Sequence, residues 1–177
     1  GERARDKVAQ LAAKLALAQG GALPLHVVPF TAVQEAVRDG APPDLAVVLY
    51  RRSMLRISQA IANARKCLAL ASGENLGQVA SQTLANMACI EAVSEMPLLR
   101  PLLSFDKAET IDLARSLGTY DLSILPFDDC CSLFVPRHPA TKAKAKTVEK
   151  FEGRLELGPI EEAAVETTEL VETKGEW

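Results

Sequence analysis

The sequence predicts an α/β protein in which a parallel sheet is flanked by helices. Segments with helical periodicity alternate with short apolar runs, which is typical of parallel strands joined by helices. One run, residues 67–71, has no polar alternation and therefore fits a strand that is covered on both faces. A loop with Gly73 and Gly77 follows this run, and both glycines are expected to adopt backbone conformations that a Cβ would penalise. A helix is expected after the loop.

The remaining segments continue this alternation. Strands are expected at residues 23–30, 45–50, 67–71 and 97–103. Helices are expected at residues 2–19, 31–38, 51–66, 81–93, 106–117, 141–151 and 160–171. Thr31 is expected to cap the second helix, and Asp106 with Glu109 to form a capping box at the fifth. Gly20 and Gly118 are expected to end the first and fifth helices.

The composition fits one domain with a small appendage. The chain has 177 residues, of which 48% are hydrophobic, so it is long enough to bury a core. No apolar run reaches the length of a membrane span and no signal peptide opens the chain, which favours a cytoplasmic protein. The net charge is −3, but residues 152–177 alone carry −6. We therefore expect a domain over residues 1–151 and an acidic extension over residues 152–177 that packs on it.

The loop after residues 67–71 is the first candidate site. In open α/β sheets, ligands bind at the carboxyl ends of strands, where backbone N–H groups and helix N-termini favour anions. Gly73 lets a ligand approach the backbone, and the side-chain amide of Gln82 can read a base or ribose because it both donates and accepts. The simpler interpretation of this pattern is a connection between a strand and a helix that binds nothing.

Three arginines begin the helix expected at residues 51–66. A guanidinium matches the oxygens of a phosphate, and Arg51 is the arginine expected to reach a strand end. Arg52 and Arg56 share another face of the helix and are expected to be solvated.

Four cysteines are present, and they do not form a zinc ligand set. Cys67 and Cys89 lie on apolar faces and are expected in the core. Cys130 and Cys131 follow two aspartates in a loop, where the aspartates raise the pKa of a thiol and nearby basic residues offset them. Reactive and structural roles for this pair both stay open, and no metal site is predicted.

A basic run follows the cysteine pair. Lys142, Lys146 and Lys150 recur every four residues and form a stripe on one face of the helix expected at residues 141–151. Such a stripe can follow a nucleic-acid backbone, and the alternative is a solubilising surface.

Residues 72–83 closely resemble the signature loop of the tRNA 4-thiouridine synthases, sulfurtransferases also linked to thiamine thiazole synthesis. The resemblance continues in the same order along nearly the whole chain, through residues 28–31, 51–52, 100–107, 118–121 and 125–131. It implies the fold of the adenine-nucleotide alpha hydrolases, also called PP-loop ATP pyrophosphatases. The first strand of that fold and its Ser-Gly-Gly-x-Asp-Ser phosphate loop are missing from the sequence. The chain is therefore expected to be the carboxyl-terminal part of a larger protein.

The resemblance also implies a chemistry and its residues. The family adenylates uridine 8 of tRNA with ATP and Mg²⁺, and a cysteine persulfide charged by a cysteine desulfurase then delivers sulfur. By position, Arg51, Gly73 and Gln82 match nucleotide-binding residues of the family. The catalytic cysteine falls in residues 128–131, with Cys131 favoured and Cys130 as its alternative or partner. The lysine stripe then becomes a candidate tRNA contact.

Two functions remain open from the sequence. The first is an enzyme domain that forms the ATP and sulfur-transfer sites of a tRNA thiolase, although this chain alone is expected to be incomplete for catalysis. The second is a non-catalytic nucleotide- or tRNA-binding remnant that keeps the fold. Because strands are missing, the exposed sheet edge is expected to pair with a second copy, which predicts a homodimer.

Overall fold

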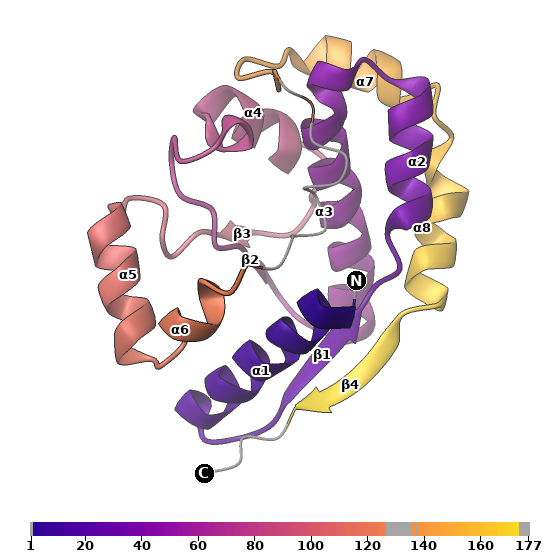
Figure 1. Cartoon of the computed structure of the whole chain (residues 1–177). Coiled ribbons are helices and arrows are strands. Elements are labelled where there is room, and N and C mark those ends of the chain that lie inside the picture. Colours follow the sequence, from indigo (N-terminus) through magenta and orange to yellow (C-terminus); the bar gives the residue numbers. More distant parts are fainter. Residues whose placement is uncertain (1, 127–135, 137, 174–177) are drawn as a thin grey trace. The chain divides into compact units, whose positions relative to one another are not determined.

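A computed structural model describes residues 2–126, 136 and 138–173 of the chain (Figure 1). It divides into two compact units. The first unit consists of Gly1–Val27, Phe105–Leu133 and Thr168–Trp177, and the second of Val28–Ser104 and Phe134–Thr167. Within the described ranges, no helix is long and apolar enough to cross a membrane.

The first unit pairs two strands that are far apart in the sequence. Strand β1 (Leu23–Val27) lies antiparallel to β4 (Glu169–Thr173), with Leu23 opposite Thr173 and Val27 opposite Glu169. The prediction of a helix over residues 160–171 is therefore wrong for its last part, because these residues find hydrogen-bond partners on β1. The prediction of β1 itself is confirmed, with a shorter extent than residues 23–30.

Helices α1 (Glu2–Gln19), α5 (Lys107–Ser116) and α6 (Tyr120–Ser123) complete the first unit. Helix α1 ends at Gly20, which has a φ of +72°, as predicted. The capping box of α5 is confirmed: the Asp106 carboxylate accepts from the backbone N–H of Glu109 at 2.8 Å, and the Glu109 carboxylate accepts from the backbone N–H of Asp106 at 2.7 Å. Gly118, which has a φ of +65°, follows the end of α5.

The second unit is built around the long helix α3 (Ala46–Ala64), which follows a short 3₁₀ turn at Pro43–Leu45 (Figure 1). Helices α2 (Thr31–Gly40), α4 (Leu84–Glu91), α7 (Ala145–Glu152) and α8 (Leu157–Glu166) all pack on α3. The prediction of a strand at residues 45–50 is wrong, because α3 includes residues 46–50. With neighbours on several sides, consecutive residues of α3 are buried, and a short apolar run does not distinguish such a helix from a strand.

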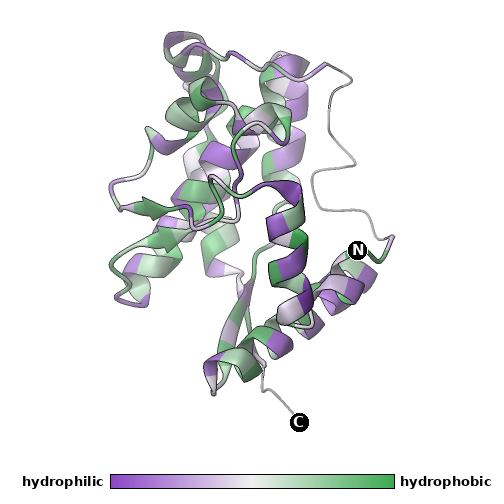
Figure 2. Cartoon of the chain, turned by 90° about the vertical axis from the view of Figure 1, so that its left-hand side faces the viewer, coloured by the Kyte–Doolittle hydropathy of each residue, from purple (hydrophilic) through white to green (hydrophobic). Residues whose placement is uncertain are grey.

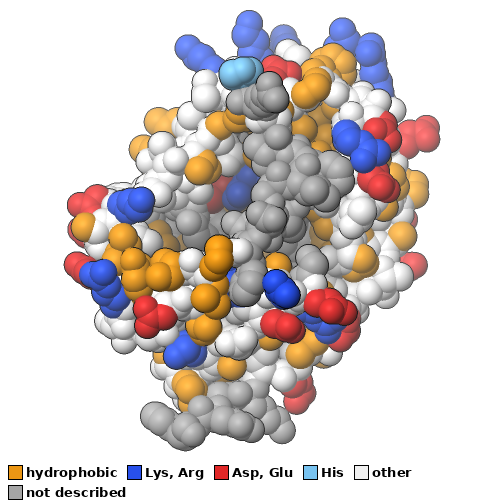
Figure 3. Space-filling model, viewed as in Figure 1, with side chains coloured by type: hydrophobic (Ala, Val, Ile, Leu, Met, Phe, Trp, Pro, Cys, Tyr) orange, Lys and Arg blue, Asp and Glu red, His pale blue; other side chains and the backbone are white. Residues whose placement is uncertain are grey.

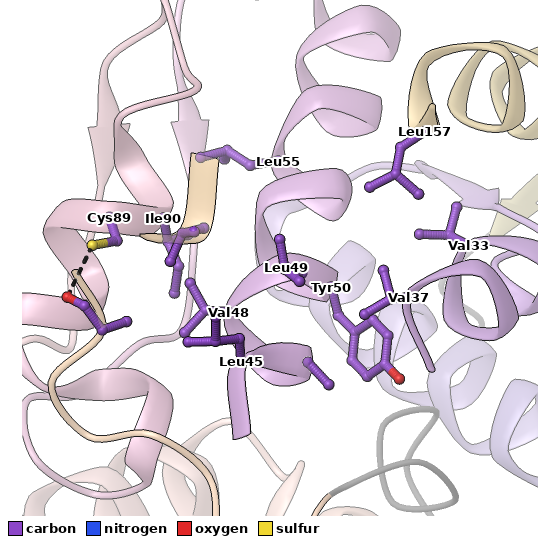
Figure 4. Packing of buried hydrophobic residues seen from close by; sticks show 13 residues of the cluster. Val33, Val37, Leu45, Val48, Leu49, Tyr50, Leu55, Cys89, Ile90 and Leu157 are labelled. Carbon is purple, nitrogen blue, oxygen red and sulfur yellow. Dashed lines mark hydrogen bonds between the residues drawn. The ribbon is translucent and has the colours of Figure 1, made fainter. Parts of the chain in front are cut away.

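Helix α3 carries the core of this unit on two faces (Figure 4). On one side, Tyr50 lies near Val33 and Val37 of α2 and Leu157 of α8. On the other side lie Ile90 and Cys89 of α4, and the Cys89 thiol donates to the carbonyl oxygen of Ala143 at 3.3 Å. Figure 2 shows hydrophobic and hydrophilic bands along the helices, as expected when each buries one face.

The parallel pairing predicted for the chain is present in the second unit. Strand β2 (Leu70–Ala71) pairs with β3 (Leu98–Leu99), with Leu70 opposite Leu98 and Ala71 opposite Leu99. This pair and the helices around it confirm the α/β fold. The strands are shorter than residues 67–71 and 97–103, and Cys67, expected in the core, is exposed. Cys89 is buried, as predicted.

Three further predictions about where helices begin are wrong. Thr31 does not cap α2, because Phe30 occupies the N-cap position and offers no side-chain hydrogen bond. In place of one helix over residues 81–93, a 3₁₀ turn (η2, Ala80–Gln82) precedes α4, whose N-cap is Thr83. Helix α7 begins at Ala145, so Lys142 lies before it and does not share its face.

The acidic carboxyl-terminal residues are divided between the two units. Helix α8 belongs to the second unit and strand β4 to the first. The boundary expected at residue 151 therefore does not separate the two compact units, and the assignment of residues 152–177 as an extension remains a prediction.

Candidate functional site

The loop between β2 and α4 is anchored at the carboxyl end of the parallel pair. The side-chain amide of Asn75 donates to the carbonyl oxygen of Leu102 at 3.0 Å. The backbone N–H of Leu76 donates to the carbonyl oxygen of Leu103 at 3.1 Å. The loop then closes on itself, because the N–H of Gly77 donates to the carbonyl oxygen of Gln82 at 2.8 Å. Gln82 is thereby held on the same loop as Gly73.

A buried carboxylate joins Arg51 to this loop. Glu74 is only 2% exposed, and its Oε1 accepts from Nη2 of Arg51 at 2.7 Å. Its Oε2 accepts from Nε of Arg100 at 2.7 Å and from the hydroxyl of Ser72 at 3.1 Å. Arg51 extends from α3 and Arg100 follows β3, so three separate segments meet at Glu74. The expectation that Arg51 reaches a strand end is confirmed.

The two guanidinium groups keep Glu74 ionised. Burial alone would raise the pKa of this carboxyl, but the hydrogen bond from Arg100, the charge of Arg51 and the hydrogen bond from Ser72 outweigh it. The pKa of Glu74 is therefore below its ordinary value. Arg100 in turn donates to the carboxylate of Glu91 at 2.7 Å.

A cavity of about 220 Å³ opens beside these charges. Arg51, Ser72 and Glu74 form its polar side. The other lining residues are Met54, Leu55, Ser58, Leu70, Ala71, Ile90 and Leu98. A mostly apolar wall with a few convergent polar groups is typical of a small-molecule site.

Polar atoms without partners lie at this loop and beside it. Among the described residues, no hydrogen-bond partner is present for the buried Nε of Arg51, Nη2 of Arg100 and Oε1 of Gln82. A buried polar group without a partner is costly, and a ligand is one way to satisfy it. Arg51 and Gln82 are two of the three residues matched to nucleotide binding in the family. They offer a donor and an acceptor.

Gly73 sits in open space on the same loop. A Cβ placed on it would meet no atom within 4 Å among the described residues, and its φ is not in the left-handed region. The expectation that a Cβ is penalised by the backbone is therefore wrong for Gly73 and correct for Gly77, which has a φ of +79°. The open space at Gly73 is consistent with close approach of a ligand.

Arg52 is buried and Arg56 is partly buried, in contrast to the prediction that both are solvated. Arg52 is 4% exposed and donates to the carboxylate of Glu152 through Nε and Nη2. Arg56 donates to Glu152 at 2.9 Å and to both carboxylate oxygens of Glu161. Sequence reasoning missed these pairs because Glu152 and Glu161 lie about a hundred residues further along the chain.

Cys130 and Cys131 lie outside the described residues. The segment that follows them is held to α4 by two side chains. The amide of Asn86 donates to the carbonyl oxygen of Ala140 at 2.7 Å. The hydroxyl of Thr83 donates to the backbone carbonyl oxygen of Thr141 at 2.7 Å.

The lysines of the basic run are exposed. Lys146 and Lys150 lie one turn apart on α7, and Lys142 and Lys144 precede the helix. Figure 3 shows lysine and arginine side chains projecting along the edge where α7 lies in Figure 1. For metals, no group of His, Cys, Asp or Glu suited to an ion occurs in the part of the chain that the structure describes.

Glu74, Arg100 and Asn86 are site residues that sequence reasoning missed. Glu74 and Arg100 both lie inside stretches that carry the family resemblance, yet nothing local shows that they form an ion pair. One signal was present for Glu74, which follows the strand predicted at residues 67–71, since ligands bind at strand ends in a parallel sheet. Arg100 falls inside the strand predicted at residues 97–103, and only the shorter β3 of the structure places it after a strand end.

Comparisons with known proteins agree with the expected family. The family model of the thiamine biosynthesis protein (ThiI) matches residues 1–157. A probable tRNA sulfurtransferase of Geobacillus kaustophilus is 49% identical over 170 residues, and one of Moorella thermoacetica is 45% identical over 175 residues. These matches cover 96% and 99% of this chain but 42% and 45% of the relatives, so the chain spans less than half of their length.

A solved structure matches as well. A crystal structure of a 4-thiouridine synthetase–RNA complex with bound ATP has a TM-score of 0.85 and 38% sequence identity to this chain. The match covers 98% of this chain and 44% of that one. The likeness therefore extends over both of the compact units.

Proposed function

Since this chain belongs to the family of the thiamine biosynthesis protein (ThiI), we propose that it forms part of the catalytic domain of a tRNA sulfurtransferase. The whole protein uses ATP to adenylate uridine 8 of tRNA and replaces the activated oxygen by sulfur, which gives 4-thiouridine. The same sulfur relay also supplies thiamine thiazole synthesis. The protein acts in the cytoplasm.

One observation carries this proposal. The matching solved structure contains bound ATP and RNA, and the three residues assigned to the nucleotide lie on the β2–α4 loop or are bonded to it. Arg51 keeps a buried donor and Gln82 a buried acceptor without partners among the described residues. These atoms and the open space at Gly73 fit a nucleotide.

Each of these residues has a distinct role in the proposal. The guanidinium of Arg51 binds phosphate oxygens, and the amide of Gln82 reads the base or ribose. Gly73 allows the nucleotide to approach the backbone. Bound ATP supplies the adenylyl group that makes the uridine oxygen a leaving group. No ligand for Mg²⁺ is assigned, since the described residues contain no cluster of three or more His, Cys, Asp or Glu side chains that could hold a metal ion.

The cysteine pair carries the sulfur in this proposal. Cys131 accepts a persulfide from a cysteine desulfurase, and Cys130 is its alternative or partner. The terminal sulfur then attacks C4 of the activated uridine and AMP leaves, so the nucleoside is joined to the cysteine through an S–S bond. Attack of a second thiolate, for which the other cysteine of the pair is the candidate, breaks this S–S bond and releases 4-thiouridine. The disulfide left on the protein is then reduced by an external thiol. The exposed lysines around α7 contact the tRNA backbone. A second copy of the chain pairs at the exposed edge of the sheet to form a homodimer.

The nucleotide role is tested by calorimetric titration of the full-length protein with ATP. We expect Arg51→Ala and Gln82→Ala each to weaken ATP binding by about tenfold, because each removes hydrogen bonds to the ligand. Arg65→Ala is the control, since Arg65 is exposed at the end of the same helix. Wild-type affinity in both site variants would show that these residues do not bind the nucleotide.

The sulfur-transfer role is tested by incubating the full-length protein with a cysteine desulfurase and cysteine and mapping persulfides by mass spectrometry. We expect a persulfide on Cys131, lost in Cys131→Ser together with tRNA thiolation. Cys130→Ser shows whether Cys130 is also required for thiolation. Cys67→Ser is the control, because Cys67 is an exposed thiol outside the cysteine pair. ATP binding without a persulfide or tRNA thiolation, in the wild-type protein as in the variants, would favour the alternative of a non-catalytic nucleotide- or tRNA-binding remnant.

A further inference from the structure

We propose that Glu74 is a positioning residue that holds the guanidinium of Arg51 in place for the nucleotide. This role rests on the proposed function of Arg51 as a nucleotide ligand. Neither the sequence patterns nor the comparisons assign a role to Glu74. The proposal starts from where its carboxylate lies, at the meeting point of α3, the β2–α4 loop and the segment after β3.

The geometry leaves Glu74 little freedom. Both of its carboxylate oxygens are engaged: Oε1 by Arg51 and Oε2 by Arg100 and Ser72. The carboxylate is nearly inaccessible to solvent, whereas the side chain of Arg51 is 30% exposed. A partly exposed arginine samples many rotamers unless a fixed partner orients it. Glu74 is that fixed partner, and Arg51 is the movable side chain that it orients.

The charges suit an anionic ligand. Glu74 carries one negative charge and contacts two guanidinium groups, so Arg51, Glu74 and Arg100 together keep one positive charge. Glu91, which also pairs with Arg100, is about half exposed and is therefore screened by solvent. Arg51 is thus held by a carboxylate without being fully neutralised, and its Nε remains without a partner among the described residues.

A purely stabilising role explains this arrangement less well. Buried ion pairs lose much of their Coulomb energy to desolvation, so they are weak evidence for stability. This pair also lines the cavity beside the loop, where orientation of a ligand-binding group has a direct effect. Arg52 of the same helix forms a comparable ion pair with Glu152 of α7, and neither residue lines this cavity.

The test is a double-mutant cycle for ATP affinity in the full-length protein, with Glu74→Gln, Arg51→Ala and the double variant. If Glu74 acts through Arg51, Glu74→Gln weakens ATP binding by about tenfold, the size expected when a hydrogen bond between charged groups is lost. Its effect then disappears in the Arg51→Ala background, because the group that it positions is gone. Thermal melting of each variant shows that it is folded.

The matched control is Glu152→Gln, which removes a buried carboxylate from Arg52 and Arg56 of the same helix. We expect it to lower the melting temperature and to leave ATP affinity unchanged. A wild-type ATP affinity in Glu74→Gln, with Arg51→Ala impaired, overturns the positioning role alone. Wild-type affinity in Arg51→Ala overturns the nucleotide role of Arg51, and the role of Glu74 with it. Equal, additive losses in both backgrounds also overturn positioning through Arg51.

Discussion

Asn86, fully buried on α4, donates a 2.7 Å hydrogen bond to the carbonyl oxygen of Ala140. The same amide donates to the carbonyl oxygen of Ala80 at 2.7 Å, and its oxygen accepts from the backbone N–H of Ala143 at 2.9 Å. Ala80 lies on the loop that carries Gln82, whereas Ala140 and Ala143 follow the candidate cysteines in the sequence. One side chain therefore ties the β2–α4 loop to the segment that follows the cysteines in the sequence.

We expect Asn86→Ala to lower the free energy of unfolding by about 3 kcal/mol, because it leaves buried backbone groups without partners. Asn86→Asp is an isosteric comparison. It places carboxylate oxygens opposite two carbonyl oxygens, so we expect at least as large a loss at pH 7 and a partial recovery in acid, where a protonated carboxyl can donate. Urea unfolding at both pH values measures this. Equal stability of Asn86→Asp and wild type at pH 7 would contradict the assigned orientation of the amide.

The ion pairs of α3 predict a loss of stability in acid. Burial raises the pKa of Glu152, but the hydrogen bonds and charges of Arg52 and Arg56 outweigh it and bring this pKa below its ordinary value of 4.5. The ion pairs of Glu152 with Arg52 and Arg56 therefore contribute their full stabilisation above pH 4.5. This contribution is lost as the pH falls through the lowered pKa that Glu152 has in the folded protein.

Urea unfolding between about pH 3 and pH 7 checks this linkage. We expect Glu152→Gln to be less stable at pH 7 and to show a shallower decline in acid than wild type. A decline as steep as that of wild type would assign the acid sensitivity to other groups. Glu74, whose pKa is also lowered, contributes a decline in the same direction and remains present in this variant.

The two glycines of the β2–α4 loop are predicted to respond differently to alanine. Gly77→Ala is expected to cost about 1 kcal/mol of stability, because its backbone is in the left-handed region. Gly73→Ala meets open space and is expected to change stability by less than about 0.5 kcal/mol. If Gly73 lies against the nucleotide, Gly73→Ala instead weakens ATP binding. Melting temperatures and ATP titrations separate the two effects, and unchanged ATP affinity in Gly73→Ala would remove Gly73 from the site.

The core around α3 predicts the largest losses from truncation. Leu49 is fully buried among its neighbours, and we expect Leu49→Ala to cost about 3 kcal/mol through lost burial and the cavity left behind. Leu68 is 89% exposed, so Leu68→Ala is the control and is expected to change stability by less than about 0.5 kcal/mol. Urea unfolding measures both. A large loss for Leu68→Ala would mean that this exposed side chain is covered by another part of the protein.

The lysines around α7 are predicted to contribute to tRNA affinity through charge. We expect the pair Lys146→Glu and Lys150→Glu to weaken tRNA binding by at least about tenfold and to reduce the dependence of affinity on salt. The pair Lys14→Glu and Lys107→Glu is the matched control, since both are exposed lysines, on α1 and α5, and the pair changes the net charge by the same amount. Filter binding at several salt concentrations measures the change. The same loss in both variants would point to net charge rather than to a surface on α7.

The sequence by itself determined the elements whose ends depend on one or two residues. The capping box of Asp106 and Glu109 and the helix ends at Gly20 and Gly118 are local interactions, so they appear in the sequence pattern and in the structure alike. The family resemblance likewise grouped Gly73 and Gln82, because both belong to the contiguous residues 72–83, and their role in nucleotide binding stays a prediction.

Tertiary structure decided what depends on distant partners. Residues 46–50 form part of a helix because several helices surround them, and residues 169–173 form a strand because β1 offers its edge. Arg52 is buried because Glu152, one hundred residues away in sequence, reaches it, and Arg51 and Arg100 converge on Glu74 because the fold brings the ends of β2 and β3 beside α3. A local pattern records the preference of a segment, whereas burial and ion pairing depend on which remote groups the fold brings within a few ångströms of it.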